Sequence, residues 1–94
     1  MNIENDKTIL LLIEAAKRYK LDKLVLFGSR AKNTEKNNSD YDLLAYGDNY
    51  YDFYCYVEDD MPTLELFDIY DGNNIGHTFN DEIIRTGIVL YEKT

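Results

Sequence analysis

The stretch LFGSRAKNTEKNNSDYDLLAYG, residues 26–47, decides the fold of this chain. It connects two short apolar, β-prone segments, Lys23–Phe27 and Asp40–Tyr46, through a glycine-serine turn and a polar loop. Gly28 interrupts the first segment, and this pattern is typical of a buried central strand that ends in a tight turn. The stretch therefore predicts two neighbouring strands with a functional turn between them.

The rest of the chain predicts alternating helices and strands. Apolar residues recur every three or four positions after Asn5-Asp6 and again over residues 75–83, which indicates two amphipathic helices. Residues Tyr50–Asp60 fit a helix nearly as well as a strand, and we favour a helix because parallel strands are normally connected by one. The remaining expected elements are a short helix over residues 30–34, a strand over Thr63–Tyr70, a turn at Gly72-Asn73-Asn74 and a small strand over Ile88–Tyr91.

This order predicts an α/β (α+β) fold, a small mixed β-sheet flanked by helices. The 94 residues suit a single domain over residues 1–94. A formal net charge of −8 argues against nucleic acid as the main ligand, since such surfaces need clustered Lys and Arg. One cysteine, no leader and no long apolar run together favour a cytoplasmic protein without a membrane segment.

Two aspartates open the second expected strand. Asp40 and Asp42 point to the same face because side chains alternate along a strand. Carboxylates are the ligands that Mg²⁺ prefers, and two such ions about 3.5–4 Å apart can clamp the oxygens of a transferring phosphoryl group. Gly28 lets the backbone approach a triphosphate, the Ser29 hydroxyl can donate to it, and Arg30 can add positive charge.

A third carboxylate is expected in the next strand. Asp68 lies between apolar residues in LFDIY, and a carboxylate in an otherwise buried strand demands a partner. Asp71 is the alternative, but its position beside Gly72 is explained by the turn that follows the strand.

The pattern of Gly28, Ser29, Asp40 and Asp42, with ten residues between the serine and the first aspartate, resembles the minimal nucleotidyltransferases of the DNA polymerase β-like superfamily. The strand around Asp68 and the closing segment over residues 82–91 are similar to the same family. The resemblance covers the chain from Lys23 to Tyr91. One departure is Asn33, where the family usually has glycine.

The resemblance implies a nucleotidyltransferase that binds ATP or another NTP with two Mg²⁺ ions. It implies Asp40, Asp42 and Asp68 as catalytic metal ligands and Gly28, Ser29 and Arg30 as the nucleotide-binding turn. It also implies a partner, a helical HEPN-type toxin, to whose tyrosine the chain transfers AMP as the antitoxin of a toxin–antitoxin pair. The alternative is a non-catalytic antitoxin that neutralises the toxin by binding, for which the tyrosines over residues 50–56 offer a contact surface.

Overall fold

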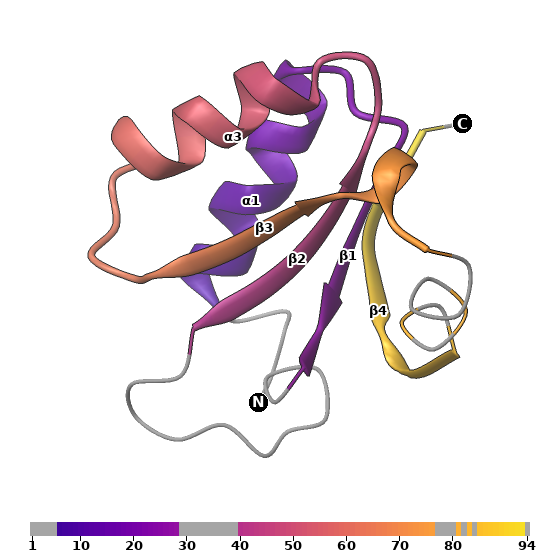
Figure 1. Cartoon of the computed structure of the whole chain (residues 1–94). Coiled ribbons are helices and arrows are strands. Elements are labelled where there is room, and N and C mark those ends of the chain that lie inside the picture. The colour runs from indigo at the N-terminus through magenta and orange to yellow at the C-terminus, as the bar shows by residue number, and fades with distance from the viewer. Residues whose placement is uncertain (1–5, 29–39, 77–80, 82, 84, 94) are drawn as a thin grey trace.

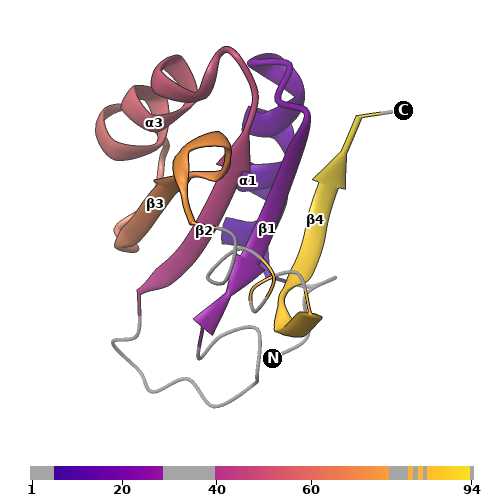
Figure 2. The ribbon, with the colours of Figure 1, turned by 45° about the vertical axis from the view of Figure 1, so that its right-hand side comes forward.

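The computed structural model describes residues 6–28, 40–76, 81, 83 and 85–93, and this part of the chain contains a four-stranded mixed sheet. Both long helices lie on the same side of that sheet (Figure 1 and Figure 2). The elements are α1 (Lys7–Arg18), β1 (Lys23–Phe27), β2 (Tyr41–Tyr46), α3 (Tyr50–Asp59), β3 (Phe67–Asp71), the 3-10 turn η2 (Gly72–Asn74) and β4 (Ile88–Glu92). The architecture confirms the expected α/β (α+β) fold.

The strand order β3-β2-β1-β4 places β1 and β2 in the centre of the sheet. β1 pairs antiparallel with β2 and with β4, whereas β2 and β3 pair in parallel. The parallel pair requires a crossover, and α3 provides it, as the sequence favoured. Because β3 is an edge strand, only one of its five residues, Ile69, is fully buried.

The main core lies between the sheet and the two helices. Alternation sends the odd residues of β2 and the even residues of β1 toward the helices. The buried apolar side chains of this layer are Ile9, Leu12, Ala15, Ala16, Leu21, Leu24, Leu26, Tyr41, Leu43, Ala45, Phe53, Val57, Met61 and Ile69. The remaining residues of β1 and β2 point to the opposite face of the sheet.

The opposite face of the sheet carries a smaller apolar cluster. Val25 and Leu44 are buried there against Ile83, with Phe27, Tyr46 and Ile75 partly buried around them (a set of six side chains). Asp42 belongs to this face, because it alternates with Leu43 and shares its side with Leu44. The candidate site therefore lies on the face that the two long helices do not cover.

Asp6 joins the start of α1 to the start of β2. Its Oδ1 accepts hydrogen bonds from the backbone N–H groups of Thr8 at 2.8 Å and Ile9 at 3.1 Å, and its Oδ2 accepts one from the Tyr41 hydroxyl at 3.0 Å. The first two bonds form an N-cap, and the third ties the helix to the strand that carries Asp42.

Asp6→Ala is expected to lower the free energy of unfolding by about 1–3 kcal/mol, since it removes a cap and the hydrogen bond that the buried Tyr41 donates to Asp6. Urea denaturation measures the change. Asp48→Ala, an exposed turn position with the same change in charge, is the control and is expected to stay within about 0.5 kcal/mol of the wild type. Equal losses in both variants would contradict the capping role.

Three details of the expected structure need correction or lie outside the described residues. The third strand begins at Phe67 rather than Thr63, because Thr63 Oγ1 accepts a hydrogen bond from the backbone N–H of Glu65 and turns the chain before it reaches β2. Ile75 has extended backbone and stands outside the last helix, of which residues 81, 83, 85 and 86 are described. The short helix expected over residues 30–34 lies outside the described residues.

The other element boundaries agree closely with expectation. β1 spans the predicted residues, α3 confirms the helical interpretation of residues 50–60, and β4 confirms the small last strand. Asp71 Oδ1 accepts from the backbone N–H of Asn73 at 3.0 Å, which confirms its interpretation as a turn residue. None of the described helices has the length and apolar character needed to cross a membrane.

Candidate functional site

The sheet register brings two acidic side chains together. Asp42 of β2 and Asp68 of β3 are direct partners in the parallel pair, so their side chains leave the sheet on the same face. On the other side of Asp42, Phe27 of β1 is its direct antiparallel partner. Asp42 is half-buried between these neighbours, whereas Asp68 is exposed. Register alone thus juxtaposes two of the three acids expected from the sequence.

The environment of Asp42 disfavours its negative charge. Burial raises the pKa of the Asp42 carboxyl above its ordinary value of 3.8, and the charges of Asp68 and then Asp40 raise it further. A side-chain hydrogen bond with Asp68 acts in the same direction, because the bond forms when one of the two carboxyls holds a proton. The site is therefore a cluster of like charges in which all three predicted acids interact, and it favours the arrival of a cation.

This charge cluster predicts how stability depends on pH in the metal-free protein. At pH values between 3.8 and the raised pKa of Asp42, the Asp42 carboxyl holds a proton in the folded protein that it has released in the unfolded chain. The free energy of unfolding therefore falls as the pH rises through this range. Below pH 3.8 the carboxyl is protonated in both states, so it no longer destabilises the folded protein. We expect Asp42→Asn to match the wild type in Tm at low pH and to exceed it increasingly as pH rises through that window. Thermal melts in EDTA measure the difference, and a difference that shrinks with rising pH would contradict this.

Gly28 packs directly against the Asp42 carboxylate. Its φ of +75° is a conformation that residues with a side chain rarely adopt. A Cβ at this position would collide with Oδ2 of Asp42 and lie 3.1 Å from its Cγ. The turn and the strand carboxylate therefore fit together only because residue 28 has no side chain. The sequence assigned this glycine to backbone approach toward phosphate, and the contact with Asp42 is an additional reason for it.

The other expected site residues divide into two groups. Asp40 lies directly before β2 and is half-buried, close enough to Asp42 to influence its pKa. Ser29 and Arg30, expected to bind the nucleotide, lie outside the described residues. One expectation was wrong: Asp68 does not lie in a buried strand, because β3 is at the edge of the sheet and exposes this side chain.

The acidic cluster suits a divalent cation that also binds a phosphate. Within the described ranges, no group of three or more His, Cys, Asp or Glu side chains forms a cation site by itself. Mg²⁺, however, is usually held by one or two carboxylates together with substrate phosphates and water. Carboxylate oxygens are the right donors. The pKa of Asp42 is raised first by burial and then by the charges of Asp68 and Asp40, and a cation would neutralise those charges. The donor set thus fits magnesium bound together with a nucleoside triphosphate.

Two aromatic residues beside the acids were not singled out from the sequence. Phe27 is next to Asp42 in register, and Tyr70 lies two residues after Asp68 on the same face of β3. Their rings contact each other with centroids 5.8 Å apart. The spacing of Asp68 and Tyr70 in the sequence could have shown that both side chains lie on one face of the strand. Phe27 lies near them only because β1 pairs with β2, which the sequence does not show.

The comparisons with known proteins agree with this geometry. The profile of the family described as "Polymerase beta, Nucleotidyltransferase" matches residues 11–94. The chain belongs to this nucleotidyltransferase family. No curated protein matches the chain.

Two solved structures resemble this nucleotidyltransferase domain in fold. A crystal structure of a toxin-antitoxin with AMP-PNP superposes with a TM-score of 0.67 and 18% identity, covering 92% of this chain and 74% of the other. A crystal structure of a mutant of the toxin-antitoxin MntA-HpeT superposes with a TM-score of 0.68 and 15% identity over the same shares. These likenesses confirm the nucleotidyltransferase fold expected from the sequence.

Proposed function

We propose that this nucleotidyltransferase domain transfers AMP from ATP to a hydroxyl group, a tyrosine of a HEPN-type toxin, and thereby acts as an antitoxin. The observation that carries the proposal is the register pairing of Asp42 with Asp68, beside Gly28 and within electrostatic reach of Asp40. Acids on neighbouring strands next to a glycine turn supply the two contacts that the reaction needs, one to cations and one to phosphates. Membership of the family supports the reaction class.

Asp40, Asp42 and Asp68 are the residues proposed to hold two Mg²⁺ ions. Bound there with ATP, the ions would neutralise charge on the phosphate oxygens and lower the barrier to transfer. Gly28, Ser29 and Arg30 are proposed to hold the β- and γ-phosphates, so that the α-phosphorus faces the acids. The carboxylates of this chain then fix where the reacting phosphate lies, and orientation of this kind accounts for much of the rate of a displacement.

The proposed reaction is a displacement at the α-phosphorus of ATP. The oxygen of the tyrosine hydroxyl forms a bond to that phosphorus, the bond from it to the oxygen shared with the β-phosphate breaks, and pyrophosphate leaves with the electron pair. The hydroxyl proton passes to a carboxylate, for which Asp68 is the candidate because it is the more exposed member of the paired acids. The product is a tyrosine–AMP phosphodiester.

The similar structures support both the nucleotide and the partner. One is a toxin-antitoxin crystallised with AMP-PNP, an ATP analogue. In the other, two aspartates that lie two positions apart are replaced by glutamates. The same spacing separates Asp40 from Asp42 in this chain. We extend the toxin partner and the adenine nucleotide to this chain as parts of the proposal.

A second candidate function is neutralisation by binding alone. It is favoured by the outer face of α3, where Tyr51 is 70% exposed and its ring stacks on that of Tyr54, 6.4 Å away. Exposed aromatic rings beside the acidic residues 58–60 suit a contact with a basic protein surface. This candidate needs no chemistry at the acids.

One experiment separates the two candidates. The purified chain is incubated with a HEPN-type toxin, labelled ATP and Mg²⁺, and label on the toxin and neutralisation of its toxicity are both measured. We expect the wild type to label and neutralise the partner, and Asp40→Asn/Asp42→Asn to do neither. If the double variant transfers no label but still neutralises the toxin fully, binding is the function. If the wild type transfers no label, the transferase proposal is wrong.

A further inference from the structure

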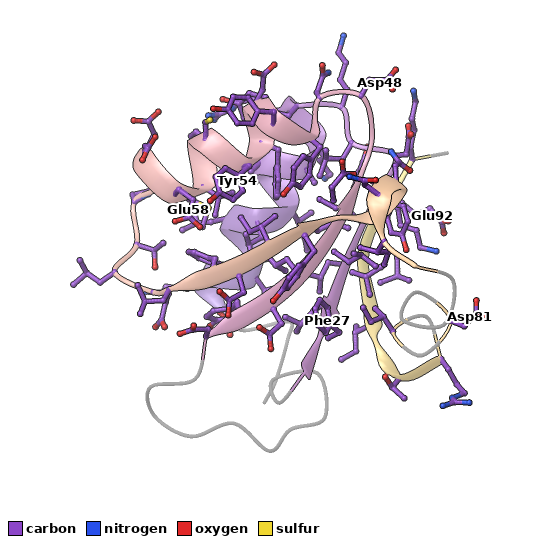
Figure 3. All side chains as sticks on the ribbon, viewed as in Figure 1. Phe27, Asp48, Tyr54, Glu58, Asp81 and Glu92 are labelled. Atoms are coloured by element: carbon purple, nitrogen blue, oxygen red, sulfur yellow. The ribbon has the colours of Figure 1, made fainter. Side chains whose placement is uncertain are left out.

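An aromatic pair forms a wall beside the acidic cluster. Phe27 and Tyr70 come from strands that do not touch each other, β1 and β3, yet their rings meet across β2 with centroids 5.8 Å apart and an interplanar angle of 48°. Tyr70 is opposite Leu44 in register, directly after the Asp42–Asp68 pair along the two strands. Phe27 is level with the acids because it pairs with Asp42, so the two rings meet diagonally across β2 beside the acidic cluster. Figure 3 labels Phe27, the last residue of β1.

The Tyr70 ring remains accessible in this arrangement. The side chain is 42% exposed, although the ring contacts Phe27. The other exposed tyrosines of the described residues, Tyr51 and Tyr54, lie on α3, whereas Tyr70 is one residue pair away from Asp42 and Asp68. Tyr70 therefore presents an exposed aromatic ring next to the acids.

The charge of the face determines which part of a nucleotide this ring can hold. Phosphates are repelled by the three aspartates unless cations are present, so they bind at the acids together with those cations. The nucleoside part carries no charge and needs an apolar surface. Tyr70 follows Asp68 by two residues, about 7 Å along an extended strand, which a ribose can bridge.

We propose that Tyr70, supported by Phe27, stacks on the base of the nucleoside triphosphate whose phosphates face the aspartates. The inference rests on the proposed nucleotidyl transfer and adds to it the residue that binds the base. Stacking uses the π-face that every base has, so this contact favours large purines over pyrimidines but reads no hydrogen-bonding edge. We therefore expect GTP to displace ATP about as well as unlabelled ATP does, and CTP and UTP to displace it less well.

The test compares ATP with inorganic tripolyphosphate, each titrated calorimetrically into the full chain with Mg²⁺. Tripolyphosphate has the phosphates but no base. We expect Tyr70→Leu, which keeps an apolar side chain of similar reach against Phe27, to weaken ATP binding about 5- to 100-fold and to leave tripolyphosphate binding unchanged. Tyr70→Phe keeps the ring and is expected to bind ATP as the wild type does. Leu10→Ala, at a 50% exposed position on α1 and on the helix-covered side of the sheet, is the control and is expected to bind both compounds as the wild type does.

The outcomes separate this inference from the function on which it rests. If the wild type binds ATP no more tightly than tripolyphosphate, or if Tyr70→Leu binds ATP normally, the stacking role is overturned and the transferase proposal stands. Equal loss in Tyr70→Phe and Tyr70→Leu would assign the effect to the hydroxyl and also overturn stacking. If the wild type binds neither compound, the proposed function fails and this inference fails with it. Thermal melts of each variant show whether the fold is retained.

Discussion

Asp42→Asn is expected to lower the rate of AMP transfer by about 10²–10³-fold, the largest effect of any single substitution in this chain. Asp42 is the acid that touches all the other parts of the site: it pairs with Asp68, interacts with Asp40 and packs on Gly28. An amide has nearly the shape of a carboxylate but no charge with which to hold a cation. Transfer of labelled AMP under single-turnover conditions measures the loss.

The same substitution is expected to have the opposite effect on the metal-free fold. Removing the central charge of three relieves repulsion and desolvation, which stabilises the protein at pH 7 by about 1 kcal/mol or less because solvent screens a partly exposed carboxyl. In the presence of Mg²⁺ and ATP we expect the wild type to be more stable than Asp42→Asn. A ligand at a hundred times its Kd stabilises the wild type by about 2.7 kcal/mol, and we expect this gain in Tm to be lost in the variant.

The control for this prediction is Asp52→Asn, an exposed aspartate on α3 with the same change of charge. It is expected to keep both the transfer rate and the ligand-dependent rise in Tm. A stable Asp42→Asn protein that still transfers AMP at the wild-type rate would rule out Asp42 as a metal ligand. Lower stability in the absence of metal would show instead that the carboxylate supports the fold.

The parts of the fold that were predictable are those in which one local pattern decides the structure. Lys23–Phe27 is a short, nearly continuous apolar run, which is typical of a central strand buried on both faces. The predicted boundaries of this strand were correct. In β2 the alternation of side chains correctly placed Asp42 on the face of Leu44 and Tyr46. The helix at residues 50–60 could not be chosen by periodicity, because its aromatics fit both periods, and the need to cross between parallel strands decided it.

The parts that failed depend on the position of strands within the sheet. Nothing in LFDIY distinguishes a central strand from an edge strand, so the exposure of Asp68 became known only from the order of the strands. The pairing of Phe27 with Tyr70 has the same origin, since two residues far apart in sequence meet across β2. The fit of Gly28 to Asp42 likewise depends on antiparallel register, whereas the sequence pattern contained only the glycine and its turn.

Gly28→Ala is expected to have the second-largest effect, because the new methyl group acts on both the backbone and the site. At a φ of +75° an alanine costs about 1–2 kcal/mol relative to glycine. Its Cβ would also collide with the Asp42 carboxylate, which must then move away from Asp68. Displacement of a metal ligand and of the phosphate-binding turn together is expected to lower transfer about 10- to 100-fold. Urea denaturation and labelled transfer measure the two effects.

Gly47→Ala distinguishes the loss of activity from general strain. Gly47 also has positive φ, +144°, but it follows β2 at the opposite end of the strand from Asp42, and a Cβ there would meet the backbone of Leu21 and Asp22. Both variants should lose stability, and only Gly28→Ala should lose transfer. A double-mutant cycle supplies the decisive comparison. In an Asp42→Ala background the contacts with Oδ2 and Cγ are removed and only the 3.3 Å contact with Cβ of residue 42 remains, so Gly28→Ala should cost clearly less than in the wild type. An undiminished cost there would show that the glycine serves the turn alone and that its contact with the carboxylate has no energetic role.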